Sequence, residues 1–340
     1  MTLQDAHRDQ AESCRRLGSP FTARLLTLAA ERVTDATPVG AHLLAWQGDV
    51  SCRGQSVPLR IAGALHRLVL SGDAELADHW PPAATQDDDG LWQAVEAAFL
   101  RREGDILAAL ETAPQTNEVR RAAALIPVLH MLAAHTEQPL ALFELGASAG
   151  LNLHLDRFAI ETGTTRYGLP DPVLTLTPDW TGPTPAPAAP RIVARRGVDL
   201  APVDPRDPSD RLRLLSFLWP DQPERRDRTI AAISVADTRV EAADAGAWLA
   251  PALAAAPEAA LPVVYHTIAW QYFSDGTKAA AMEAMEDAGR PVARIAMEAD
   301  PNGDAAAAEL TLWPGGTIHR LARVDFHGRW VDWTGPTTLS

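Results

Sequence analysis

Helical periodicity dominates the first third of the chain. Apolar residues return every three or four positions, which places them on one face of a helix. Ser19 followed by Pro20 is typical of a helix start. Pro127 predicts a kink or a break in the last helix, because proline removes a helical hydrogen bond. The expected helices make up a helical region over residues 1–137 and lie at residues 19–33, 61–70, 91–100 and 117–134.

After Pro139 the pattern changes to strands that alternate with helices. Short, continuous apolar runs are typical of strands buried on both faces of a sheet. The alternation predicts a Rossmann-like, mostly parallel α/β sheet over residues 138–340. The strand-like runs lie at residues 140–145, 261–265 and 294–297, and the helical patterns between them at residues 242–253 and 277–288.

Two further patterns complete this second region. Residues 308–313 and 317–326 flank the turn Pro314-Gly315-Gly316 and are expected to form an antiparallel hairpin that closes one edge of the sheet. Residues 183–190 (PTPAPAAP) contain too many prolines for a helix or a central strand, so we expect an exposed loop there.

The composition is that of a folded protein. Of 340 residues, 46% are hydrophobic and 22% are charged, and the net charge is -14. This charge opposes binding to nucleic acid and to anionic membranes. The N-terminus is polar, and no run of about twenty apolar residues occurs, so we expect a cytoplasmic protein without a membrane partner. The histidines are scattered without metal-ligand spacing, so we expect no metal.

The segment with most chemical information is FELGASAGLNLHLDR, residues 143–157. A strand, a turn of small residues and a helix are expected to follow one another there. Such a turn leaves the main chain bare, so that a nucleoside or phosphate could approach and meet free amide groups at the start of the helix. Glu144 on the strand would cost several kcal/mol to bury without a partner or ligand. We therefore expect a binding site at this turn.

Two common motifs fit the turn incompletely. The dinucleotide fingerprint G-x-G-x-x-G fails after Gly146, because Ala149 stands at the third position. The turn does match G-x-S-x-G, which would make Ser148 the nucleophile of a serine hydrolase. The strands and the oxyanion loop expected before that motif are missing from the sequence. Later acids and histidines still keep the alternative open, among them Asp237, His266, His319 and His327.

The same turn resembles the first motif of class I S-adenosylmethionine-dependent methyltransferases, acid-x-Gly-x-Gly-x-Gly. Glu144, Gly146 and Gly150 match, and Ser148 replaces the middle glycine. Because serine tolerates a positive φ worse than glycine, the backbone at Ser148 must be ordinary if this resemblance holds. The resemblance implies S-adenosylmethionine as the cofactor, held by Glu144, Gly146, Ala147, Ser148, Gly150, Asn152 and Asp244.

The whole chain resembles an uncharacterised bacterial family, domain of unknown function 2332. The resemblance implies a methyltransferase-like α/β core behind a helical N-terminal part. It is carried by PQTNEV at residues 114–119, ELGASAGLNL at 144–153, LWPDQPER at 218–225, YHTIAWQY at 265–272, LTLWPGG at 310–316 and HGRW at 327–330.

The acceptor side of the site follows from the order of strands in such a core. Residues 261–266 would form the fourth strand, which lies beside the first, and both carboxyl ends would open on the ligand crevice. His266, Gln271 and Tyr272 would then lie near the transferred methyl group. His266 is the candidate general base, and a structural histidine at a strand end is an equal alternative.

Three acidic positions have open roles. Asp244 resembles the third methyltransferase motif, whose acid contacts the adenine amine, although an N-cap for the following helix is favoured. The acid that holds the ribose normally ends the second strand, and Glu161 and Asp199 both remain candidates. Residues 218–225 form either a loop over the acceptor pocket or a turn with Trp219 in the core.

Together these patterns predict methyl transfer from S-adenosylmethionine to a small or medium-sized acceptor. Two alternatives remain. One is a serine hydrolase that uses Ser148. The other is a non-catalytic nucleotide-binding protein on a degenerate methyltransferase scaffold, suggested by the missing middle glycine.

Overall fold

The computed structural model describes residues 1–339 and divides the chain into two compact units. The first consists of Met1–Thr116 and Asp207–Asp227, and the second of Asn117–Arg206 and Arg228–Ser340. The division differs from the predicted boundary at residue 137, because the helix after residue 121 belongs to the sheet-containing unit. The chain also returns once to the first unit, which no local pattern indicates.

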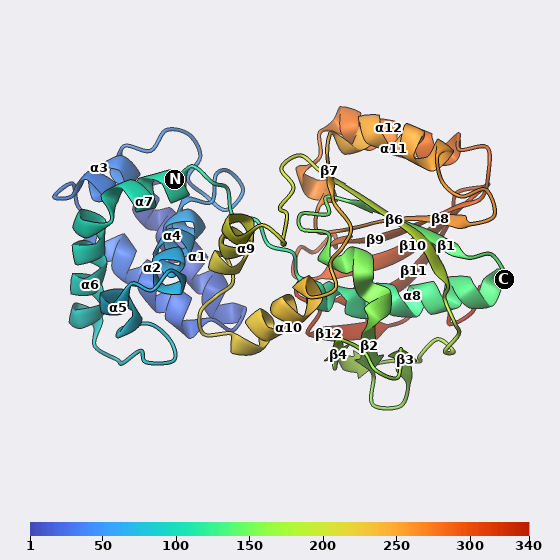
Figure 1. Cartoon of the computed structure of the whole chain (residues 1–340), viewed down its shortest axis with the longest axis horizontal. Helices are drawn as coiled ribbons and strands as arrows, with labels where there is room; N and C mark the ends of the chain where they lie inside the picture. Colours follow the sequence, from blue (N-terminus) through green and yellow to red (C-terminus); the bar gives the residue numbers. More distant parts are fainter. Residues whose placement is uncertain (340) are drawn as a thin grey trace. The chain divides into compact units, whose positions relative to one another are not determined.

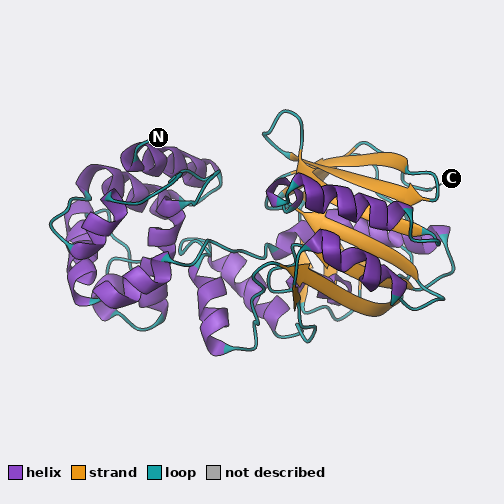
Figure 2. Ribbon diagram, turned by 90° about the horizontal axis from the view of Figure 1, so that it is seen from above, coloured by secondary structure: helices purple, strands orange, loops and turns teal. Residues whose placement is uncertain are grey.

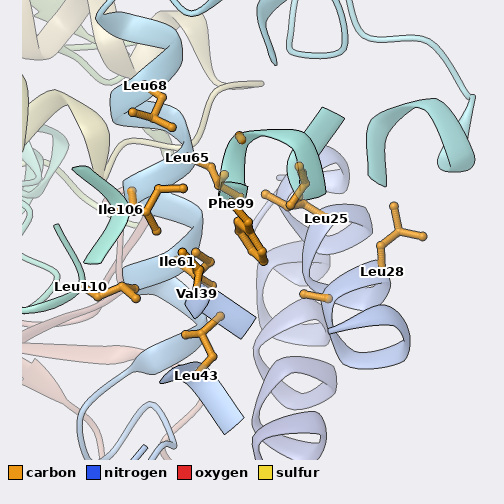
Figure 3. Close-up of a cluster of buried hydrophobic side chains, with 14 of the residues drawn as sticks. Leu25, Leu28, Val39, Leu43, Ile61, Leu65, Leu68, Phe99, Ile106 and Leu110 are labelled. Carbon is orange, nitrogen blue, oxygen red and sulfur yellow. The ribbon is translucent and has the colours of Figure 1, made fainter. Parts of the chain in front are cut away.

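The first unit is built from helices and loops (Figures 1 and 2). The predicted helix start at Ser19 is confirmed, since its Oγ accepts a hydrogen bond from the amide of Thr22 at 3.3 Å. The apolar faces meet in a core that includes Leu25, Leu65 and Phe99 (Figure 3). The helices are α1 (Leu3–Arg16), α2 (Pro20–Arg32), α3 (Pro38–Leu44), α4 (Val57–Leu70), α5 (Ala74–Ala77), α6 (Asp88–Arg101), α7 (Glu103–Leu110) and α9 (Pro208–Ser216), while α10 (Pro223–Ile233) begins here and ends in the second unit. None of the helices within residues 1–339 is long and apolar enough to cross a membrane.

The segment around Trp219 belongs to this helical unit. Trp219 packs against the cluster that contains Cys14 and Leu26, and the guanidinium of Arg225 lies 5.5 Å from the centre of its ring. Asp221 accepts a hydrogen bond of 2.7 Å from the amide of Phe21. Of the two roles considered for this segment, the packing matches a turn with Trp219 in the core.

The second unit is organised around one large sheet, nine-stranded within the described residues, in the order β5-β12-β11-β10-β9-β8-β1-β6-β7. From β7 to β9 neighbouring strands are parallel, which confirms a Rossmann-like α/β sheet. The chain builds outward from β1, first through β6 and β7 and then, on the other side, through β8 and β9. The strands are β1 (Leu140–Leu145), β5 (Asp179–Thr181), β6 (Ile192–Asp199), β7 (Glu241–Ala242), β8 (Leu261–Thr267), β9 (Val292–Ala299), β10 (Ala306–Trp313), β11 (Thr317–Val324) and β12 (Trp330–Trp333).

This strand order creates a switch point between β1 and β8, where successive connections leave in opposite directions. Ligands of open α/β sheets bind in the crevice outside the carboxyl ends of the strands at such a point. The predicted pairing of the fourth strand with the first is confirmed, because β8 lies parallel to β1 with Glu144 opposite Tyr265.

Helices cover both faces of the sheet. Phe143 and Leu145 of β1 pack toward Trp248 of α11 (Ala245–Ala254), beside which lies α12 (Asp275–Glu286). Figure 1 shows these two helices above the sheet and α8 (Ala122–His135) below it. Pro127 lies inside α8, so of the predicted kink or break the break does not occur. Pro127 lies in the second turn of α8, where it removes one backbone hydrogen bond. The first two turns are completely buried, and this packing holds the helix together.

Other elements complete the unit. The predicted hairpin is confirmed as β10 and β11, but it does not end the sheet, because β12 and β5 continue beyond it. Residues 183–190 form the predicted loop. A small second sheet was not predicted and consists of β2 (Phe158–Glu161), β3 (Arg166–Gly168) and β4 (Leu174–Leu176). Short 3₁₀ helices are η1 (Val119–Arg121), η2 (Leu151–Arg157) and η3 (Trp270–Tyr272).

Candidate functional site

The bend that follows β1 lies at the switch point. Gly146 and Gly150 have φ of 71° and 69°, and Ser148 has φ of 53°. The ordinary backbone predicted for Ser148 is therefore wrong. Its left-handed conformation is fixed from both sides, since its amide donates to Oδ2 of Asp199 at 2.8 Å and its carbonyl accepts from the amide of Val203 at 3.1 Å.

Most amide groups of the bend are bonded within the protein. The amides of Gly146 and Ala147 donate to the carbonyl of Val198 at 2.9 and 3.0 Å. The amide of Leu151 donates to Oδ1 of Asn117 at 2.8 Å, and the chain continues as the 3₁₀ helix η2 rather than as an α-helix. The expectation that these amides point freely at a ligand is wrong, because the neighbouring strand and the PQTNEV segment occupy them.

The glycines of the bend also serve close packing. A Cβ at Gly146 would lie 2.6 Å from the Cβ of Ala269, and a Cβ at Gly150 would lie 2.9 Å from Cγ2 of Val240. The main chain at these two positions therefore faces protein rather than open space. A ligand that reaches this edge of the sheet has to approach along Ser148 and the end of β6.

Three buried polar side chains around the bend have an unpaired atom. Glu144 is 2%, Ser148 4% and Asn152 1% exposed. Within residues 1–339, Oε2 of Glu144, Oγ of Ser148 and Oδ1 of Asn152 have no hydrogen-bond partner. Buried polar atoms are nearly always satisfied by protein, water or a ligand, so these three atoms have capacity for a further partner. They follow one another from the end of β1 into η2 and mark the candidate site.

The surroundings of Glu144 favour its protonated form. Burial raises the pKa of its carboxyl well above its ordinary value, and the negative charge of Asp199 raises it further, while Arg121 opposes the shift. Arg121 itself donates to the carbonyls of Thr267, at 3.0 Å, and Phe326, at 2.9 Å. A neutral Glu144 can donate a hydrogen bond as well as accept one.

Asp199 is the acid at the end of the strand next to β1. Its Oδ1 accepts from the amide of Ala201 at 3.0 Å, and its Oδ2 holds Ser148. Glu161, the other acid left open by the sequence, lines a separate pocket of about 700 Å³ with Arg166 and Trp180. Asp199 thus lies at the switch point. The sequence did not single out Asp199, because Arg195 and Arg196 interrupt the apolar pattern by which β6 would be recognised as a strand.

His266 is completely buried, and both of its ring nitrogens are bonded. Nδ1 lies 2.6 Å from Oε1 of Glu298, and Nε2 accepts from Nε of Arg294 at 3.0 Å. Burial lowers the pKa of His266, and Glu298 opposes this shift. No nitrogen is left to take a proton from a substrate. The geometry therefore matches the alternative in which His266 is a structural histidine at a strand end. Gln271 and Tyr272 are exposed in η3, Tyr272 to 73%.

Asp244 is the N-cap of α11. Its Oδ1 accepts from the amides of Gly246 and Ala247 at 3.0 and 3.1 Å, and its Oδ2 from Oγ1 of Thr277 at 2.6 Å. The N-cap interpretation is therefore confirmed. Contact of Asp244 with an adenine stays a prediction.

The hydrolase alternative lacks an activating base in this geometry. Oγ of Ser148 has no hydrogen-bond partner within residues 1–339, and His266 is bonded elsewhere. His154 faces Asp237, with Nε2 3.7 Å from Oδ1. A serine nucleophile requires a base within hydrogen-bond reach of its hydroxyl.

Comparison with known families gives one finding. Residues 4–333 match the model of a family described as "Uncharacterized protein conserved in bacteria (DUF2332)". No curated protein and no solved structure matches the chain. The family resemblance drawn from the motifs is thus confirmed, while the methyltransferase-like character of the core stays a prediction.

Proposed function

Because the chain belongs to the bacterial family DUF2332, whose description names no activity, we propose its function from the site itself. We propose that the second unit binds S-adenosylmethionine at the carboxyl ends of β1 and β6 and transfers its methyl group. The acceptor is a small or medium-sized molecule that lies toward β8.

The position of Asp199 is the observation that carries this proposal. In the methyltransferase resemblance, the acid that holds the ribose ends the second strand. β6 lies next to β1 on the side opposite β8, which is the second strand's place in a sheet of this order. Its last residue is Asp199, which already contacts the glycine bend through Ser148. An acid at this place accepts hydrogen bonds from two vicinal hydroxyls.

The unpaired atoms support the proposal for the rest of the ligand. Glu144, Ser148 and Asn152 offer hydrogen-bonding groups in a buried setting, where such bonds are strong. S-adenosylmethionine supplies an electrophilic methyl group when bound. The protein's part is to align the acceptor through Gln271 and Tyr272. Since His266 is bonded on both nitrogens, the acceptor attacks in a form that does not need His266 as a base.

Calorimetry with S-adenosylmethionine and S-adenosylhomocysteine tests the proposal. We expect both to bind the wild type and to bind Asp199→Asn about tenfold more weakly, a loss of about 1.4 kcal/mol. Asn keeps one acceptor oxygen, which can take the amide of Ser148, while the amide of Ala201 loses the partner that Oδ1 of Asp199 provides. Asp171→Asn, at an exposed loop position, is the matched control and should bind like the wild type. Absence of binding up to about 1 mM, or about 4 kcal/mol of affinity, overturns the proposal.

The packing of Ala269 against Gly146 favours a second candidate, a nucleotide-binding protein without transferase activity. The two candidates differ in what the methionine part of the ligand contributes. A transferase binds S-adenosylhomocysteine more tightly than adenosine, because it holds the sulfur and the amino acid. Equal affinity for adenosine and S-adenosylhomocysteine supports the non-catalytic candidate.

A further inference from the structure

A single carboxylate oxygen holds the turn that follows β8. Oε1 of Glu298, on β9, accepts hydrogen bonds from the amides of Ala269 and Trp270, each at 3.1 Å. The same oxygen lies 2.6 Å from Nδ1 of His266. Although burial raises the pKa of Glu298, these donors more than offset that effect and hold the pKa below its ordinary value. The charged carboxylate is therefore the form that binds the turn.

Arg294 determines which way His266 presents its proton. Nε of Arg294 always carries a hydrogen and donates it to Nε2 of His266 at 3.0 Å. Nε2 must therefore be the acceptor nitrogen, and Nδ1 carries the proton that points at Glu298. The negative charge of Glu309, on the adjacent strand β10, also stabilises the charged form of Arg294.

Trp270 closes this arrangement. Its ring stacks on His266, with centroids 4.7 Å apart and planes 19° apart, and the guanidinium of Arg294 lies 4.7 Å from the ring centre. Its own amide is one of the groups that Glu298 binds. The indole ring thus covers His266 and Arg294. Glu298, which bonds His266, also binds the backbone amide of Trp270, so the contacts of these residues support one another.

The turn held in this way is strained and touches the candidate site. Ile268 has φ of 50°, and a left-handed conformation at a β-branched residue persists only where the surroundings impose it. The next residue, Ala269, places its Cβ against Gly146. Ser148 and Ile268 follow the two strands that flank the switch point, so both strand ends are held in an uncommon conformation by a carboxylate.

We propose that Glu298 is a positioning residue: through the amides of Ala269 and Trp270 it fixes residues 268–273 against Gly146. It thereby presents Gln271 and Tyr272 at the switch point. His266 and Arg294 act through Glu298 by aiming and holding its carboxylate. The role in presenting acceptor contacts rests on the proposed function. The positioning of the turn does not, and it is testable without a ligand.

Hydrogen–deuterium exchange of the full chain tests the positioning. In Glu298→Ala we expect exchange to rise by about tenfold or more in peptides that cover residues 268–273 and the bend at Gly146, and to stay unchanged elsewhere. Glu298→Gln keeps an acceptor oxygen and should restore near wild-type exchange. Glu283→Ala, at an exposed position of α12, is the control. Wild-type exchange at residues 268–273 in Glu298→Ala, or a rise spread over the whole unit, overturns the proposal.

The tautomer of His266 provides a second test. Nitrogen-15 NMR of the ring, assigned with His266→Gln, should show a neutral imidazole with the proton on Nδ1. A proton on Nε2 overturns the arrangement with Arg294. If the wild type binds no S-adenosylhomocysteine but both ligand-free results are as expected, the proposed function falls and the positioning role stands. If it binds but the exchange result fails, the positioning role falls alone.

Discussion

Oδ2 of Asp199 accepts a hydrogen bond of 2.8 Å from the amide of Ser148, and this bond joins the end of β6 to the bend after β1. The two residues lie on neighbouring parallel strand ends, where one supplies a carboxylate and the other a left-handed backbone. The bond explains how a serine occupies a position with φ of 53°. It also places a charge near Glu144, whose protonated state it favours.

Substitution of Ser148 separates backbone strain from side-chain chemistry. Ser148→Gly relieves a left-handed conformation that costs about 1 kcal/mol and adds a similar entropic cost, so the free energy of unfolding should change by less than about 1 kcal/mol. Ser148→Val should destabilise by about 2 kcal/mol, because a β-branched residue is poorly tolerated at positive φ. Urea unfolding measures both, with Ser234→Val, at an exposed position, as control. Equal effects of the two valine variants would contradict the strained backbone.

A side chain added at Gly146 should reduce stability in two ways, by a steric clash with Ala269 and by the strain of a positive φ. Gly146→Ala should destabilise by about 2–4 kcal/mol, because its new Cβ meets that of Ala269 at a position with positive φ. Gly289→Ala is the matched control, since Gly289 has φ of 66° and a Cβ added there would have no neighbour within 4 Å. It should cost only about 1 kcal/mol. Ala269→Gly combined with Gly146→Ala should recover the difference between the two single variants; if it recovers nothing, the contact does not carry the cost.

Glu144 makes stability depend on pH. Its folded pKa lies above its ordinary value of 4.5, so the folded protein binds the proton more strongly than the unfolded chain does. The stabilising effect of this proton is complete below the unfolded pKa and is lost as pH rises through the folded pKa. Glu144→Gln keeps the shape without an ionisable proton. The advantage of Glu144→Gln over the wild type should therefore grow with pH above 4.5.

Urea unfolding at a series of pH values measures this advantage. Glu258→Gln, at an exposed position, is the control and should follow the wild type at every pH. Parallel curves for Glu144→Gln and the wild type would show that Glu144 titrates normally in the folded protein.

Asn117 connects the PQTNEV segment to the bend. Its Oδ1 accepts the buried amide of Leu151 at 2.8 Å, and its side chain is 6% exposed. Asn117→Ala leaves that amide unsatisfied and should cost about 1–3 kcal/mol. Exchange of the Leu151 amide should rise as well. Asn302→Ala, in an exposed loop, is the control. If Asn117→Ala loses no more stability than this control, water replaces the Asn117 oxygen.

Local patterns in the sequence determined much of the fold. The run LALFEL ends at the same residues as β1, the Pro-Gly-Gly turn separates β10 from β11, and Ser19 caps α2. Each of these features is set within a few residues, by hydrophobic periodicity or by turn and cap chemistry. The family was also accessible from the sequence, because its motifs lie in short segments.

Tertiary structure alone decided how the site is filled. The glycines of the bend predicted bare main chain, but Ala269 and Val240, from distant segments, occupy that space. His266 looked equally suited to catalysis and to structure until Glu298 and Arg294, on another strand, bonded both of its nitrogens. A short segment specifies which conformations its backbone prefers. Which side chains meet it, and which of its polar atoms remain unpaired, depends on the strand order that brings distant residues together.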